Sequence, residues 1–180
     1  MITPRITNKL RGSLGEIYYK EFCDQQGWAY TSLENLYSSM NPDWIFTFKK
    51  GFHRIKVRIP QKIRTEISWL VKPTNNSESN PSFVFDFLAC KVGKSKNYSG
   101  VKSSDFFSWV ESKTGTGIFS TSQINALSKI KLPIAIFHID NVLDAPGDIK
   151  MGFDVKPGKK WLEELVPVDN EIYELAKKLT

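Results

Sequence analysis

A glutamate and a lysine stand two positions apart in the stretch WVESKTG, residues 109–115. The aromatic and branched residues before them are typical of a buried strand. Because residues i and i+2 of a strand project from one face, Glu111 and Lys113 should point together, while Ser112 points away and leaves its carbonyl oxygen available. Carboxylate and carbonyl oxygens are hard ligands that Mg²⁺ accepts. A lysine beside such an ion can orient an attacking water or offset the charge of a reacting phosphate.

A second carboxylate is needed to hold the ion, and Asp86 is the candidate. It stands within FVFDFLAC, residues 83–90, an apolar run that predicts a strand. An unpaired charge there would be costly, so something must compensate it. The gap between Asp86 and Glu111 fits two antiparallel strands joined by a loop. We therefore expect Asp86, Glu111 and the Ser112 carbonyl to bind Mg²⁺, with Mn²⁺ as a substitute.

The surrounding pattern predicts the elements that position these residues. A helix is expected over 13–26, ended by Gly27, with Glu16 in its first turns. Strands are expected at 44–48, 54–59, 64–71, 83–90, 105–113 and 133–139. A helix is expected from about 120 to 131, and another at 169–179. Polar loops are expected after residue 72 and after residue 91. This order indicates one α/β (α+β) domain with a mixed central sheet flanked by helices.

The arrangement resembles the PD-(D/E)xK nuclease superfamily, which includes restriction endonucleases and archaeal Holliday-junction resolvases. The matching pieces are Glu16 on the first helix, Asp86 in FDFLA, Glu111 and Lys113 in VESKTG, and Gln123 in STSQ. The resemblance spans about residues 13–139 and is nearest to the resolvase-type branch. It implies a restriction-endonuclease-like core, catalytic roles for these five residues, DNA as substrate and a homodimer.

The sequence also departs from the family pattern. Phe85, not proline, precedes Asp86, and the literal Pro42-Asp43 pair lies far from Glu111. Asp86 is favoured, although a long insertion could give its place to Asp43. We expect the core at about 13–27 and 64–139, an inserted basic β-hairpin within about 28–63, and a C-terminal extension over 140–180.

Charge is concentrated in one part of the chain. The net charge is +6, and residues 49–72 alone carry +7, so the remainder is close to neutral. Such a block fits the electrostatic footprint of nucleic-acid binding. The residues expected to contact phosphates are Lys49, Lys50, Arg54, Lys56, Arg58, Lys62, Arg64, Lys91, Lys94, Lys96 and Lys102.

Each of these features also has a purely structural interpretation. Glu111 and Lys113 could form an ion pair on a solvated face. Ser120 and Gln123 have the spacing of a helix capping box. Glu16 could be an acid favoured by the helix dipole, and the basic block could be a solvated sheet surface.

Together these patterns predict a Mg²⁺-dependent endodeoxyribonuclease, acting on duplex or branched DNA. The alternative is a catalytically silent nucleic-acid-binding or assembly module on the same fold. Two isolated cysteines, no signal-peptide pattern and no membrane-length apolar run lead us to expect a cytoplasmic protein without a membrane partner.

Overall fold

A computed structural model describes residues 7–72, 82–93, 98–115, 117, 119–139, 148–152 and 166–167. The loop expected after residue 72 and the helix expected at 169–179 fall largely or wholly outside these residues. No helix in this part of the chain is long and apolar enough to cross a membrane.

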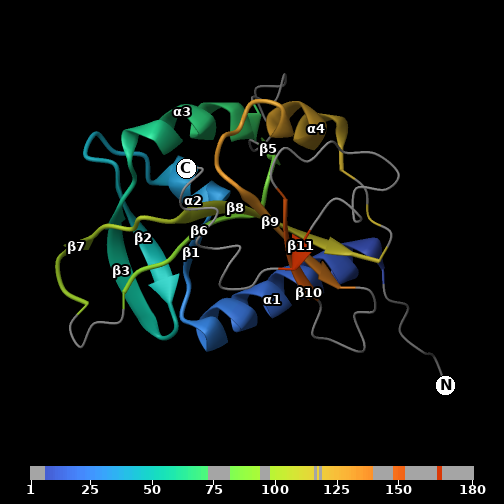
Figure 1. Cartoon of the computed structure of the whole chain (residues 1–180), viewed down its shortest axis with the longest axis horizontal. Helices are drawn as coiled ribbons and strands as arrows, with labels where there is room; N and C mark the ends of the chain where they lie inside the picture. The colour runs from blue at the N-terminus through green and yellow to red at the C-terminus, as the bar shows by residue number, and fades with distance from the viewer. Residues whose placement is uncertain are drawn as a thin grey trace.

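The described residues form a mixed sheet in the order β11-β10-β9-β8-β6-β1-β2-β3-β7 (Figure 1). The fold is therefore α+β, as expected. The strands of this sheet are β1 (Ala29–Ser32), β2 (Ile45–Lys50), β3 (His53–Arg58), β6 (Phe87–Cys90), β7 (Val101–Lys102), β8 (Phe107–Thr114), β9 (Ile134–Ile139), β10 (Asp148–Gly152) and β11 (Val166–Pro167). A separate pair joins β4 (Val71–Lys72) to β5 (Ser82–Phe83).

Helices cover both faces of the sheet. Figure 1 shows α1 (Asn8–Gln26) below the sheet, with α3 (Gln61–Leu70) and α4 (Thr121–Leu127) above it. The short α2 (Leu33–Ser38) follows β1 directly. Each face carries its own hydrophobic core. Tyr19, Phe87 and Phe137 belong to the core on the α1 side, and Leu88, Trp109 and Ile136 to the other.

The first helix begins earlier than its apolar pattern predicts. Thr7 caps it, since the Thr7 hydroxyl accepts a hydrogen bond from the Leu10 amide. Gly27 ends it in the left-handed conformation, at φ 72°, which costs glycine little. Glu16 therefore lies in the middle of α1 rather than in its first turns, so the helix dipole no longer explains it.

The strand expected over residues 64–71 is wrong. Residues 61–70 form α3, which buries Ile63, Ile67 and Leu70 against the sheet. These three follow helical spacing. However, Ile67, Trp69 and Val71 are of residue types with high strand propensity, which favoured a strand. Glu66 is also buried, at 3% exposure. Its carboxylate accepts hydrogen bonds from the Trp109 indole (2.7 Å) and from the Lys131 amide (2.6 Å).

The expected basic hairpin is present as β2 and β3, and it is part of the central sheet. Register pairs Lys49 with Arg54 and Thr47 with Lys56. Along β3, Ile55 and Val57 are buried while Arg54, Lys56 and Arg58 are exposed. The predicted alternation, with the three cations on one face, is confirmed.

Candidate functional site at the ends of strands β6 and β8

Asp86 and Glu111 meet because β6 and β8 are neighbouring antiparallel strands, as expected from their spacing. Phe87 pairs with Val110, so Asp86 stands at the start of β6 beside Glu111. The Asp86 amide donates to the Val110 carbonyl at 3.0 Å. Asp43 is exposed at the start of β2, and β1 separates β2 from β6. The structure therefore places Asp86, not Asp43, next to Glu111.

Glu111 lies in a buried polar cluster with Lys113 and Gln123. Its Oε1 accepts hydrogen bonds from Lys113 Nζ (2.7 Å) and from Gln123 Nε2 (2.6 Å). Lys113 Nζ also donates to Gln123 Oε1 at 3.0 Å. The expectation that Glu111 and Lys113 share a face is confirmed. They are not a solvated pair, because their side chains are only 8% and 12% exposed.

Gln123 reaches this cluster from the N-terminus of α4. It closes a capping box with Ser120, as its sequence spacing indicates. The same side chain donates from Nε2 to the Val84 carbonyl and to Glu111. The structural interpretation of Gln123 is therefore confirmed, but it does not account for all of this side chain's contacts.

Ser112 projects to the opposite face, as expected. A β-carbon on Gly15 of α1 would come within 3.5 Å of Ser112 Cβ, so α1 packs closely here. The Ser112 hydroxyl and amide both donate to Asp86 Oδ2, at 2.6 and 2.8 Å. Because both backbone groups of a strand residue point to one edge, the Ser112 carbonyl also lies on the edge that faces β6 and Asp86.

The charge on Asp86 affects two other carboxyl groups. Burial, and then the nearby Asp86 carboxylate, raise the pKa of Glu111 to about 7. The same two causes, burial and then Asp86, raise the pKa of Glu16 from its ordinary value. The acids of α1 and β8 are thus each electrostatically coupled to Asp86 at the start of β6.

The donor set partly fits a Mg²⁺ ion. Asp86, Glu111 and the Ser112 carbonyl offer hard oxygens, and water can complete an octahedron around two carboxylates. However, within the described residues no three His, Cys, Asp or Glu side chains are close enough to hold a metal ion together. Glu111 is instead hydrogen bonded to Lys113 and Gln123.

A cleft of about 930 Å³ opens beside Asp86 on the α1 side of the sheet. It is lined by Glu16 and Lys20 of α1, by α2, and by the exposed face of β2 and β3. Glu111 and Lys113 do not line it, because they project toward α4. Asp86 and the Ser112 backbone therefore stand between the cleft and the buried Glu111 cluster.

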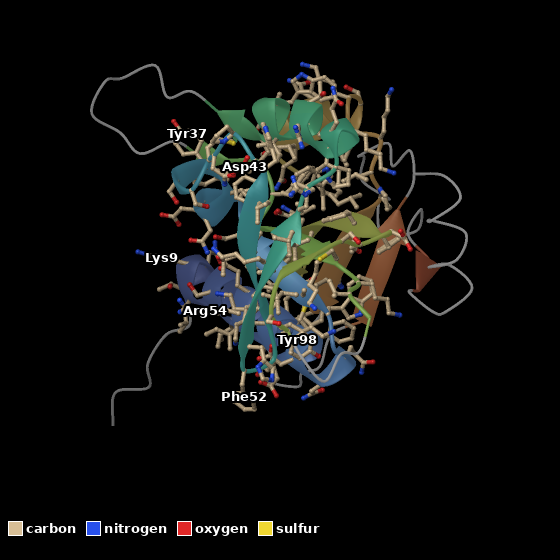
Figure 2. The ribbon with its side chains drawn as sticks, turned by 90° about the vertical axis from the view of Figure 1, so that its left-hand side faces the viewer. Lys9, Tyr37, Asp43, Phe52, Arg54 and Tyr98 are labelled. Atoms are coloured by element: carbon tan, nitrogen blue, oxygen red, sulfur yellow. The ribbon has the colours of Figure 1, made fainter. Side chains whose placement is uncertain are left out.

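The expected phosphate-binding residues are divided by the fold. Lys49 and Arg54 line the cleft, and Lys56 and Arg58 continue along the same face of β3. In Figure 2, Arg54 lies on the same side of the molecule as Lys9 of α1, and Phe52 marks the hairpin tip.

The remaining basic residues that the structure describes lie outside the cleft, and the prediction that Lys50 contacts phosphates is wrong. Lys50 is buried at 7% exposure, and its ammonium donates to the carbonyls of Gly27 (2.6 Å) and Val92 (3.0 Å). It is therefore a structural residue. Lys62 and Arg64 are on α3, Lys91 lies over the Trp28 ring, and Lys102 is on β7. Lys94 and Lys96 are outside the described residues.

Among the residues that line the cleft, those of α2 and Lys20 of α1 were not predicted from the sequence, whereas Glu16 was. Residues 28–42 carry no clear periodicity, although Ser32 is an N-cap whose hydroxyl accepts from the Asn35 amide. That serine was the available signal for α2. Lys20 is an isolated cation in the sequence, so no pattern indicated that it would line the cleft.

No family model matches the chain, and no curated protein or solved structure is significantly similar to it.

Proposed function

We propose that this protein is a Mg²⁺-dependent endodeoxyribonuclease with a PD-(D/E)xK-type, restriction-endonuclease-like site. The observation that carries the proposal is that Glu111, Lys113 and Gln123 form one buried hydrogen-bonded cluster, while Asp86 is electrostatically coupled both to Glu111 and to Glu16. A purely structural origin for each residue does not require this cluster and this coupling. Asp86 and Glu16 also line a cleft to which Lys20, Lys49 and Arg54 contribute cations.

In this proposal Asp86, Glu111 and the Ser112 carbonyl hold the metal ion, which supplies Lewis-acid activation when bound. Lys113 Nζ, 2.7 Å from Glu111, positions the attacking water and offsets charge on the phosphate. Gln123 holds both side chains through its amide. Glu16, which also lines the cleft, assists in orienting the substrate or in binding a second metal ion. Phosphates are bound by Lys49, Arg54, Lys56 and Arg58.

The test is metal-dependent cleavage of labelled duplex, flap and four-way-junction DNA, with Mg²⁺, Mn²⁺ or EDTA. We expect cleavage that EDTA abolishes. The variants Asp86→Asn, Glu111→Gln and Lys113→Met should each lose about 100-fold or more, as expected for groups acting in the transition state. Glu21→Gln is the matched control, since Glu21 is an exposed acid of α1 that contacts Gln25. Equal cleavage by all variants would reject the assigned site.

The second candidate is a catalytically silent DNA-binding or assembly module. One observation favours it: Glu111 is already paired with Lys113 and hydrogen bonded to Gln123, and it does not line the cleft. This candidate predicts DNA binding through Lys49 and Arg54 with no cleavage under any metal. The same assay therefore separates the two functions. A homodimer, which would bring two sites to two strands, is a further part of the nuclease proposal, and sedimentation equilibrium tests it.

A further inference from the structure

The cleft beside Asp86 is lined by both acids and cations. Lys49 and Arg54 pair across β2 and β3, which lie two and three strands from β6 in the sheet. Glu16, Lys20 and Glu34 complete the charged lining. Lys56 and Arg58 extend the same exposed face of β3 beyond Arg54. A polyanion bound along this face would thus be led toward the proposed metal ligands.

Two lysines of the cleft lie over aromatic rings. Lys20 Nζ lies 5.5 Å from the centre of the Phe87 ring, and Lys49 Nζ lies 5.8 Å from that of Tyr30. Lys49 also pairs with Asp24 at 3.1 Å. Cations held over aromatic rings lose less side-chain freedom when they bind a phosphate than lysines extended into solvent do.

The size of the cleft limits what can enter it. A volume of about 930 Å³ is within the roughly 300–1,000 Å³ of pockets that enclose a small molecule. A few nucleotides of one strand fit such a volume. A duplex is bulkier, because every nucleotide of one strand carries a paired nucleotide of the second. Single-strand sites use basic grooves that follow the sugar-phosphate backbone. Of the aromatic lining residues, Tyr30, Phe85 and Phe87 are buried, and Phe83 is partly exposed.

We propose that the cleft between α1, α2 and the β2–β3 hairpin binds a single DNA strand. Its phosphates lie along Arg54 and Lys49, and the strand leads to Asp86. This inference rests on the proposed function, and it specifies the substrate as DNA that offers an unpaired strand next to a duplex, such as a flap or a tail. Asn35 and Ser38 of α2 provide polar groups along the opposite wall.

Binding is tested by fluorescence anisotropy in EDTA, where no cleavage competes. The probes are a thymidine oligonucleotide, a blunt duplex, and the same duplex with a single-stranded thymidine tail. We expect the oligonucleotide and the tailed duplex to bind several-fold more tightly than the blunt duplex. Arg54→Gln should weaken the binding of the oligonucleotide and of the tailed duplex. It should also lower the slope of log Kd against log salt by about 0.7, because one phosphate contact is lost.

Lys129→Gln is the matched control, because Lys129 is exposed just after α4 and does not line the cleft. It should leave the affinity for the tail unchanged, and circular dichroism of each variant verifies folding. Equal affinity for tailed and blunt duplexes, or equal effects of Arg54→Gln and Lys129→Gln, would overturn the single-strand site.

Parallel cleavage assays in Mg²⁺ separate this inference from the proposed function. Tail binding that depends on Arg54 without any cleavage would leave the strand site standing and reject the nuclease. Cleavage of blunt and tailed duplexes at equal rates, without preference in binding, would retain the nuclease and reject the strand site.

Discussion

The buried carboxyl of Glu111 should make the stability of the metal-free protein depend on pH. Glu111 is only 6% exposed. Burial, and then the charge of the nearby Asp86, raise the pKa of its carboxyl group from 4.5 to about 7. A group whose pKa is raised by folding stabilises the native state while it is protonated. That contribution is complete below pH 4.5 and is lost as pH rises through about 7.

The magnitude follows from the size of the shift. Each pKa unit corresponds to about 1.4 kcal/mol, so a shift from 4.5 to about 7 amounts to about 3 kcal/mol. The Glu111→Gln variant isolates this effect. The glutamine keeps an oxygen that can accept from Lys113 and Gln123, and it cannot titrate. At low pH the wild type carries the neutral acid, so both proteins have the same charge beside Lys113.

Urea denaturation of both proteins in EDTA, from pH 4.5 to about 8, measures the difference. We expect the free energy of unfolding of the wild type to fall by about 3 kcal/mol relative to the variant over this range. Glu21→Gln, at an exposed site, controls for the loss of one negative charge. Adding Mg²⁺ at the high-pH end should restore wild-type stability alone, because a ligand that binds only the native state stabilises it.

A constant difference between wild type and Glu111→Gln across the pH range would refute the argument. It would mean that Glu111 titrates as an ordinary carboxyl. The assigned burial and coupling to Asp86 would then be wrong, whatever the DNA assays show.

Further predictions concern the helices and the buried core around the site. Glu66→Gln should destabilise by about 3 kcal/mol, since an amide nitrogen opposite the Trp109 indole leaves a buried donor unpaired; urea denaturation measures this, and the effects of Glu66→Gln and Trp109→Phe should be less than additive in the double variant. Gly12→Ala should stabilise α1 by about 0.5–1 kcal/mol because its β-carbon meets open space. Gly15→Ala should gain less, since its β-carbon would lie 3.3 Å from Thr114 Cγ2, and equal thermal shifts would contradict this contact. Cys23 and Cys90 are buried, and burial raises the pKa of Cys23 to about 12 and that of Cys90 as well; thiol titration at pH 8 should therefore modify both only on unfolding, and rapid modification of the native protein would show that the thiols are accessible.

Several site contacts follow from spacing alone. The two-residue period of a strand places Glu111 and Lys113 together and Ser112 opposite, and the structure has this arrangement. The gap from Asp86 to Glu111 predicts antiparallel neighbours, which β6 and β8 are. These contacts were predictable because they depend on local periodicity and short connections.

Other features depend on partners distant in sequence. Glu66 was placed on a strand because its neighbours favour strands, yet it is held in α3 by Trp109 and Lys131. Lys50 appeared to be one of many surface cations, but the Gly27 and Val92 carbonyls bind its ammonium. The secondary-structure propensity of a residue contains no information about such contacts, because they form between segments that are distant in sequence and come together only in the folded sheet.

The sequence by itself determined which residues carry the candidate chemistry, since residue type and strand period are local properties. Only the tertiary structure decided how those residues are divided. It buried Glu111 and Lys113 beneath α4, left Asp86 at the mouth of the cleft, and brought Glu16 across from α1. The physical reason is that the two faces of the sheet are covered by different helices, and no local pattern specifies which helix covers which face.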